Sequence, residues 1–144
     1  MEIDLDFFEL RFAHFLSENH PDIIAEKGDQ TKEFIQKKAN EAYYIYEEKI
    51  KEGTHADAAI ECADTSLKEG LIFSKFNFIE NILEEYFPLF FKKSLSGNKI
   101  NDEIIKLINY CKDVFIKYDT TDQYVYSADL ETEIIGTLTE IIKE

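Results

Sequence analysis

The sequence predicts an all-α fold: a compact orthogonal or antiparallel bundle of about six helices that forms a single domain over residues 1–144. Apolar residues recur every three or four positions along most of the chain, which is the period of an α-helix. No stretch alternates apolar and polar residues with the period of two that a strand needs. Only two prolines and five glycines interrupt 144 residues, a length typical of one domain with its own core.

The first predicted helix, residues 4–19, carries two apolar stripes. Asp4 and Asp6 suit its N-terminal end, which carries partial positive charge. One stripe consists of Leu5, Phe8, Phe12, Phe15 and Leu16, and the other, on nearly the opposite side, of Ile3, Phe7, Leu10 and His14. A surface helix needs only one apolar stripe, so this helix is either central to the fold or shared with another subunit or partner. His20-Pro21-Asp22 ends it.

A loop at residues 26–30 leads to two further helices, over about 31–52 and 55–69. The inward side of the first is formed by Ile35, Ala39, Ala42, Tyr43, Tyr46 and Ile50. After Gly53, the stretch Thr54 to Asp57 is typical of a capping box with Thr54 as N-cap. The second helix has a face of small residues that lets a neighbouring helix approach closely, and Gly70 is its expected C-cap.

The second half of the chain predicts three more helices. Residues 73–91 are rich in aromatic side chains, with Ser74 as candidate N-cap and Pro88 as a point where the helix ends or kinks. A loop over 94–98 precedes a helix that starts near Asn101 and points Ile104, Leu107, Ile108, Cys111 and Phe115 inward. A polar loop over 118–126 leads to the last helix, residues 128–143.

Composition limits the classes of partner. The chain has 30 acidic and 16 basic residues and a formal net charge of -14, with the excess of acids spread along its length. This excess of negative charge opposes binding to nucleic acid or to an anionic membrane, so we expect neither as a partner. No apolar run approaches the ~20 residues of a membrane span. Two scattered cysteines and an N-terminus without a basic segment predict a cytoplasmic protein without a secretory signal.

No catalytic constellation emerges from the residue pattern. The Glu-x-x-His spacing of di-iron proteins occurs once, from Glu52 to His55, across an expected helix break. Cys62 and Cys111 are interpreted as small buried core residues. No phosphate-binding glycine motif and no nucleophile elbow is present. We therefore predict no catalytic residue, no metal ligand and no cofactor.

The second stripe of the first helix is the candidate site. We predict a contact with a protein partner or with a second copy of the chain, through Ile3, Phe7, Leu10, Arg11 and His14. Arg11 and His14 lie three residues apart, so together they are able to hold an anion or a partner's carboxylate. The competing interpretation makes His14 a half-buried histidine that is hydrogen-bonded within the fold.

The stretch Gly70 to Phe76 has the sequence Gly-Leu-Ile-Phe-Ser-Lys-Phe. In this stretch, its most specific part, the chain resembles a family of uncharacterised all-helical domains of unknown function from Bacteroidetes-type bacteria. Further matching positions are Leu10-Arg11, Phe15-Leu16, Glu18 to Pro21, Ala39, Ala42, Tyr46, Gly53, Ala58, Leu67, Leu83 to Phe87 and, more weakly, Val114 to Tyr118. The resemblance implies a small all-α domain. It carries no catalytic residue over, and it favours a binding role.

Two functions follow as hypotheses. The first is a non-enzymatic cytosolic protein-interaction or accessory domain with an acidic surface. The alternative is a small-molecule-binding domain or enzyme, whose pocket would be lined by the aromatics of 73–91 and the tyrosines Tyr43, Tyr44, Tyr46 and Tyr110. A third hypothesis is an acidic mimic of nucleic acid, which requires carboxylates spaced like phosphates on one face.

Overall fold

A computed structural model describes residues 2–118 and 127–143, and it contains nine α-helices and one short 3₁₀ turn within them. The prediction of an all-α fold is confirmed, because this described part contains no strand. The chain divides into two compact units, Met1–Ile72 and Phe73–Glu144. The prediction that residues 1–144 act as a single domain stays a prediction.

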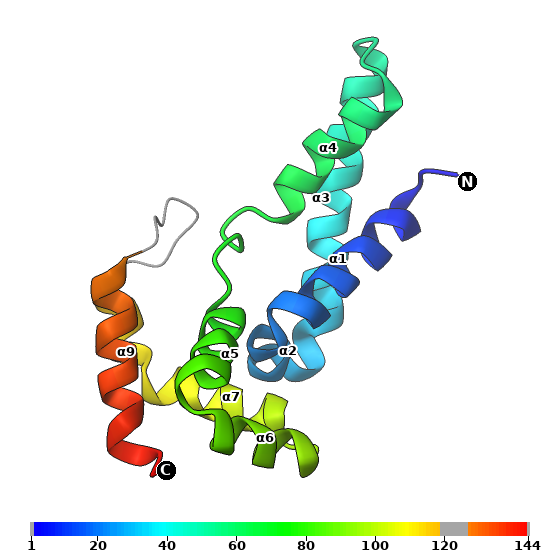
Figure 1. Ribbon diagram of the computed structural model, residues 1–144. Helices are drawn as coiled ribbons and strands as arrows, with labels where there is room; N and C mark the ends of the chain where they lie inside the picture. Colours follow the sequence, from blue (N-terminus) through cyan, green and yellow to red (C-terminus); the bar gives the residue numbers. More distant parts are fainter. Residues whose placement is uncertain (1, 119–126, 144) are drawn as a thin grey trace. The chain divides into compact units, whose positions relative to one another are not determined.

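The first unit is built around an antiparallel helix pair (Figure 1). Its helices are α1 (Leu5–Asn19), α2 (Pro21–Lys27), α3 (Thr31–Lys51) and α4 (Ala56–Leu67), with the 3₁₀ turn at Gly28–Gln30. The pair consists of α3 and α4, and α1 packs along α3. This arrangement leaves the outer side of α1 available for contacts.

The ends of these helices follow from local capping. The Asp4 carboxylate accepts a hydrogen bond from the Phe7 backbone N–H at 3.0 Å, as expected for an N-cap. The N-cap of α4 is His55, not Thr54 as predicted, and its Nδ1 accepts from the Asp57 backbone N–H at 3.2 Å. Gly53, with φ at +90°, makes the turn between α3 and α4 because glycine adopts this backbone without steric cost.

The core of the first unit combines large residues of α1 with small ones of α3 and α4. The buried members are Phe8, Phe12, Leu16, Ala39, Ala42, Ala63 and Leu67. The alanines let the three helices approach closely, as the small face of residues 55–69 predicted. The predicted inward stripe of α3 is only partly buried, because Tyr43 and Tyr46 are half-buried and Ile50 is 40% exposed.

The second unit contains α5 (Lys75–Tyr86), α6 (Pro88–Ser96), α7 (Ile100–Tyr110), α8 (Lys112–Lys117) and α9 (Ala128–Ile141). Helix α5 lies between neighbours, since it packs against α6, α7 and α9. The buried core is Phe76, Ile79, Ile82, Leu83, Phe87, Ile104, Leu107, Ile108, Cys111, Phe115, Leu130, Ile134, Leu138 and Ile142. Most of the predicted aromatic face of residues 73–91 therefore serves this core.

Helix α8 is tied to α9 by a carboxylate. Glu133 accepts hydrogen bonds from Lys117 Nζ at 2.6 Å and from the Tyr118 hydroxyl at 2.7 Å. These two hydrogen bonds lower the pKa of Glu133, because they stabilise its ionised form.

Several predicted boundaries are wrong. Residues 21–27, which were not predicted as helix, form α2. Helix α5 ends at Tyr86, before Pro88, as predicted, but the new helix that Pro88 starts continues through the predicted loop at Ser94 to Ser96. The following helix begins at Ile100 and divides at Cys111. The predictions that Ser74 is an N-cap and that Pro88 interrupts a helix are confirmed. Most of the predicted loop 118–126 lies outside the described residues.

Candidate functional site

The outer face of α1 is the candidate site, and the predicted contact residues divide there into two groups. Leu10 is 72% exposed, and the side chains of Arg11 and His14 are 44% and 73% exposed. Ile3 and Phe7 are half-buried against the core of the first unit. The second apolar stripe is thus partly core and partly surface. The helix presents Leu10, Arg11 and His14 to solvent.

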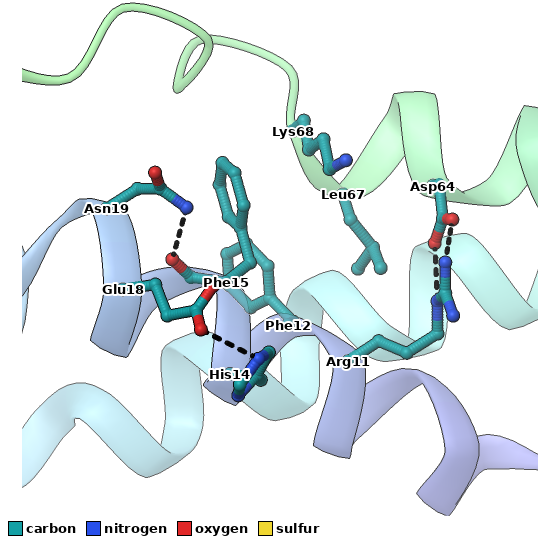
Figure 2. A pocket seen from close by; sticks show the side chains of 9 residues that line it. All are labelled: Arg11, Phe12, His14, Phe15, Glu18, Asn19, Asp64, Leu67 and Lys68. Carbon is teal, nitrogen blue, oxygen red and sulfur yellow. Dashed lines mark hydrogen bonds and ion pairs between the residues drawn. The ribbon is translucent and has the colours of Figure 1, made fainter.

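An open groove of about 360 Å³ runs between α1 and α4 on one side of this face. We call it the α1–α4 groove, and it is lined by Arg11, Phe12, His14, Phe15, Glu18, Asn19, Asp64, Leu67 and Lys68. Figure 2 shows the apolar side chains between charged ones from both helices. Phe12 and Leu67 are buried core residues, so the groove has an apolar floor and a charged rim.

Arg11 crosses from α1 to α4 and holds Asp64 with two hydrogen bonds (Figure 2). The Nε donates to Asp64 Oδ1 at 2.9 Å, and Nη2 donates to Oδ2. The hydrogen bond with Asp64 raises the pKa of Arg11. The guanidinium also lies 5.2 Å from the centre of the Phe7 ring. Asp64 and Phe7 therefore hold the Arg11 side chain in place within the first unit.

His14 and Lys68 complete the charges of the groove. His14 Nε2 lies 3.1 Å from Glu18 Oε1, one helical turn away. The expectation that His14 is half-buried is wrong, because its side chain is 73% exposed. Lys68 Nζ lies 5.4 Å from the centre of the Phe15 ring. Arg11 and His14 each have a carboxylate partner within the first unit, and the prediction that they hold an anion or a partner's carboxylate stays a prediction.

A second hollow, of about 390 Å³, lies on the other side of the same helix. We call it the α1–α3 hollow, and it is lined by Asp6, Glu9, Leu10, Ala13 and Ile35. Its centre is apolar and its two charges are both negative. Leu10 thus stands beside an acidic hollow on one side and near the mixed-charge groove on the other. Both depressions are open to solvent, as protein-binding surfaces are, while small-molecule sites are more enclosed.

The aromatic side chains of the alternative hypothesis belong to two different units. Tyr43 and Tyr46 lie within 6.3 and 5.9 Å of the Phe8 ring in the first unit, measured between ring centres. Tyr44 is 65% exposed. Tyr110 and the aromatic residues of α5 and α6 belong to the second unit. Within each unit, most of these rings serve the core or lie on the surface.

The remaining sequence candidates fall outside the candidate site. Cys111 is buried, as predicted, and burial raises the pKa of its thiol to about 11. Cys62 is exposed, so its interpretation as a core residue is wrong. His20 is buried at the junction of α1 and α2, where Nε2 donates to the Leu71 carbonyl at 2.6 Å. Among the described residues, no three His, Cys, Asp or Glu side chains group as a metal site would require.

No helix in the described part of the chain combines the length and the apolar character that a membrane-spanning segment needs.

Sequence reasoning missed the partners that α3 and α4 contribute to the site. Asp64 and Lys68 lie more than fifty residues from Arg11 and Phe15, so no local pattern linked them. Ile35 was predicted as an inward residue of α3 and lines the α1–α3 hollow. The spacing of residues within α1 was the available signal, and it pointed to Arg11 and His14 of the groove and to Leu10 of the hollow.

The sequence model of a family described as a domain of unknown function (DUF1896) matches residues 1–144. The chain is also similar to a solved structure, the crystal structure of protein PG0816 from Porphyromonas gingivalis, a member of the Bacteroidetes. The two chains share 26% sequence identity with a TM-score of 0.78, over 95% of this chain and 89% of that chain. No curated protein matches the chain. The resemblance seen in the sequence is thereby confirmed, and the chain belongs to the family described as a domain of unknown function (DUF1896).

Proposed function

We propose that this protein is a non-enzymatic, cytosolic protein-interaction domain, and that the outer face of α1 contacts its partner. The observation that carries the proposal is Leu10, a large apolar side chain that is 72% exposed at the middle of a well-formed helix. Leu10 lines the open α1–α3 hollow, and Arg11 and His14, one and four residues later, line the open α1–α4 groove. A single exposed leucine is ordinary on a protein surface, so the adjoining depressions are what give Leu10 its significance.

The chemistry of the face suits a protein partner. Protein interfaces combine an apolar centre with a polar rim, and here Leu10 has charged residues on both sides. The Arg11–Asp64 hydrogen bonds hold α1 and α4 together before any partner arrives. A surface ordered in advance loses less conformational entropy on binding, which favours affinity.

Charge and cysteine chemistry support the rest of the proposal. A net charge of -14 attracts basic proteins and repels nucleic acid and anionic membranes. Both cysteines are free, and one of them is exposed, which suits a reducing compartment such as the cytosol.

Affinity capture with matched surface variants tests the proposal. Leu10→Lys places a charge at the centre of the proposed contact. Ile116→Lys places the same charge at a 65% exposed position of the second unit and serves as the control. We expect the native chain and Ile116→Lys to capture at least one protein from the host cell that Leu10→Lys does not capture. Circular dichroism should show that all three chains are equally helical. Equal capture of every bound protein by both variants would contradict the proposal.

A further inference from the structure

Helix α6 carries a ridge of exposed leucine and lysine side chains on an otherwise acidic protein. Leu89 and Leu95 are 65% and 51% exposed, and Lys92 and Lys93 are also exposed. Leu89, Lys92 and Lys93 lie within about 100° of one another around the helix, and we call these three residues the α6 ridge. Between Glu85 and Asp102 the chain has three lysines and no acidic residue. This is a local reversal of the charge that dominates the sequence.

The α1–α3 hollow has the complementary character. Leu10, Ala13 and Ile35 form its apolar part, and Asp6 and Glu9 supply negative charge. Among residues 2–118 and 127–143, none of Asp6, Glu9, Lys92 and Lys93 takes part in an ion pair. The charges of both surfaces are therefore available to an external partner.

The spacing of leucine and charge matches between the two surfaces. Asp6 precedes Leu10 by four residues on α1, and Lys93 follows Leu89 by four residues on α6. Four residues make about one helical turn, or ~6 Å along the axis. If the two helices cross in opposite directions with Leu89 against Leu10, Lys93 comes to lie opposite Asp6. The apolar contact and the ion pair then form together.

We propose that the α6 ridge of one molecule docks into the α1–α3 hollow of a second copy of the same chain. The proposal rests on the proposed function, because it names the partner of the outer face of α1 as the protein itself. The two surfaces differ, so the contact is head-to-tail. Such an interface adds further copies until a ring closes or a filament grows. One short helix buries little area, so the association is weak, and the net charge of -14 on each copy opposes it further.

Two charge-reversed chains and their mixture test this pairing. Lys92→Glu with Lys93→Glu makes the α6 ridge negative, and Asp6→Lys with Glu9→Lys makes the α1–α3 hollow positive. Each variant alone places like charges on both surfaces. An equimolar mixture restores opposite charges across both possible contacts. The mixture also shows that loss of association in a single variant does not come from failure to fold.

Light scattering coupled to gel filtration, at about 10 µM to 1 mM protein, gives the readout. We expect the native chain to rise above its monomer mass of 16.9 kDa as the protein concentration increases. Each variant alone should stay monomeric, and the mixture should associate. The control exchanges Lys112 and Lys143, both exposed, for glutamate and should associate like the native chain.

Two results would overturn the pairing: a native chain that stays monomeric at the highest concentration, or a mixture that stays monomeric while the native chain associates. In either case, a partner that is lost only by Leu10→Lys in the capture experiment would leave the proposed function standing. A different protein would then occupy the outer face of α1.

Discussion

Leu10 and Leu16 offer a matched pair of substitutions on one helix. Both are leucines of α1, six residues apart, but Leu16 is fully buried and Leu10 is 72% exposed. Leu16 belongs to the core of the first unit, together with Phe12 and Leu67. Replacing each leucine with alanine removes the same atoms from two different environments. The difference in the free energy of unfolding then reports which side of α1 is core and which is surface.

The expected magnitudes follow from burial. Leu16→Ala removes a buried side chain and leaves a cavity, which costs about 2–5 kcal/mol. Complete burial of a leucine contributes about 1.5–3 kcal/mol, and only about a quarter of Leu10 is hidden, so Leu10→Ala costs roughly 0.4–0.8 kcal/mol. The higher helix propensity of alanine offsets a small part of this loss. The gap between the two variants should be at least about 1.2 kcal/mol, which denaturation resolves readily.

Urea denaturation followed by circular dichroism at low protein concentration is the assay, with the transition of the first unit analysed separately if two transitions are seen. A loss above about 2 kcal/mol for Leu10→Ala, or equal losses for both variants, would refute the assignment of Leu10 to the surface. Repeating the Leu10→Ala measurement at high concentration separates burial within the chain from burial in an assembly, because only the latter depends on concentration.

Three further outcomes are expected. Cys62 is exposed and should react with a maleimide in the folded protein. Cys111 is buried and its pKa is raised to about 11, so it should react only in denaturant. Mass spectrometry after digestion measures the labelling of each cysteine, and equal labelling in the folded protein would contradict this. The lowered pKa of Glu133 means that its carboxylate stabilises the fold above the pKa of the unfolded chain and that this contribution is lost as the pH falls through the folded-state pKa. Glu133→Gln should therefore have a lower urea midpoint than the native chain at neutral pH, and its midpoint should decrease less as the pH falls below about 4. If the midpoint of the variant has the same pH dependence as that of the native chain, the interaction of Glu133 with Lys117 and Tyr118 does not stabilise the fold. A double-mutant cycle of Arg11→Met and Asp64→Asn should give a coupling of up to about 1 kcal/mol that weakens with salt, because the Arg11 side chain is 44% exposed; a coupling independent of salt would contradict this.

The fold class and several helix ends were predictable because they depend on neighbouring residues. The stripe of Phe8, Phe12 and Leu16 recurs at helical spacing and is fully buried. Asp4 and Ser74 are N-caps in the structure because their side chains accept from the backbone three residues later. Such interactions span only a few residues, so a sequence pattern contains both partners.

Other boundaries depended on contacts that no local pattern contains. Helix α2 has seven residues, about two turns, which is too short for an apolar period to be recognised. Ser94 and Ser96 have the composition of a loop, yet α6 continues through them and Ser94 is buried. The break at Cys111 occurs without glycine or proline. Packing overrides weak intrinsic preferences at these positions.

The candidate site was predictable in part. From the second stripe of α1, the sequence predicted that Leu10, Arg11 and His14 contact a partner or a second copy of the chain. They did not indicate that Ile3 and Phe7 would pack against the first unit while Leu10 stays exposed. That outcome depends on where α3 and α4 lie around α1.

The sequence by itself determined that this chain forms helices, many of the side chains that enter the cores, and the strong excess of acidic residues, because periodicity, capping and charge are properties of residues close together in the chain. Only the tertiary structure decided that Asp64 would pair with Arg11 across 53 positions of sequence and that Ile35 and Leu10 would line one hollow. Contacts between distant residues depend on how helices of given length and side-chain size pack, and many sequences with the same local pattern would pack differently.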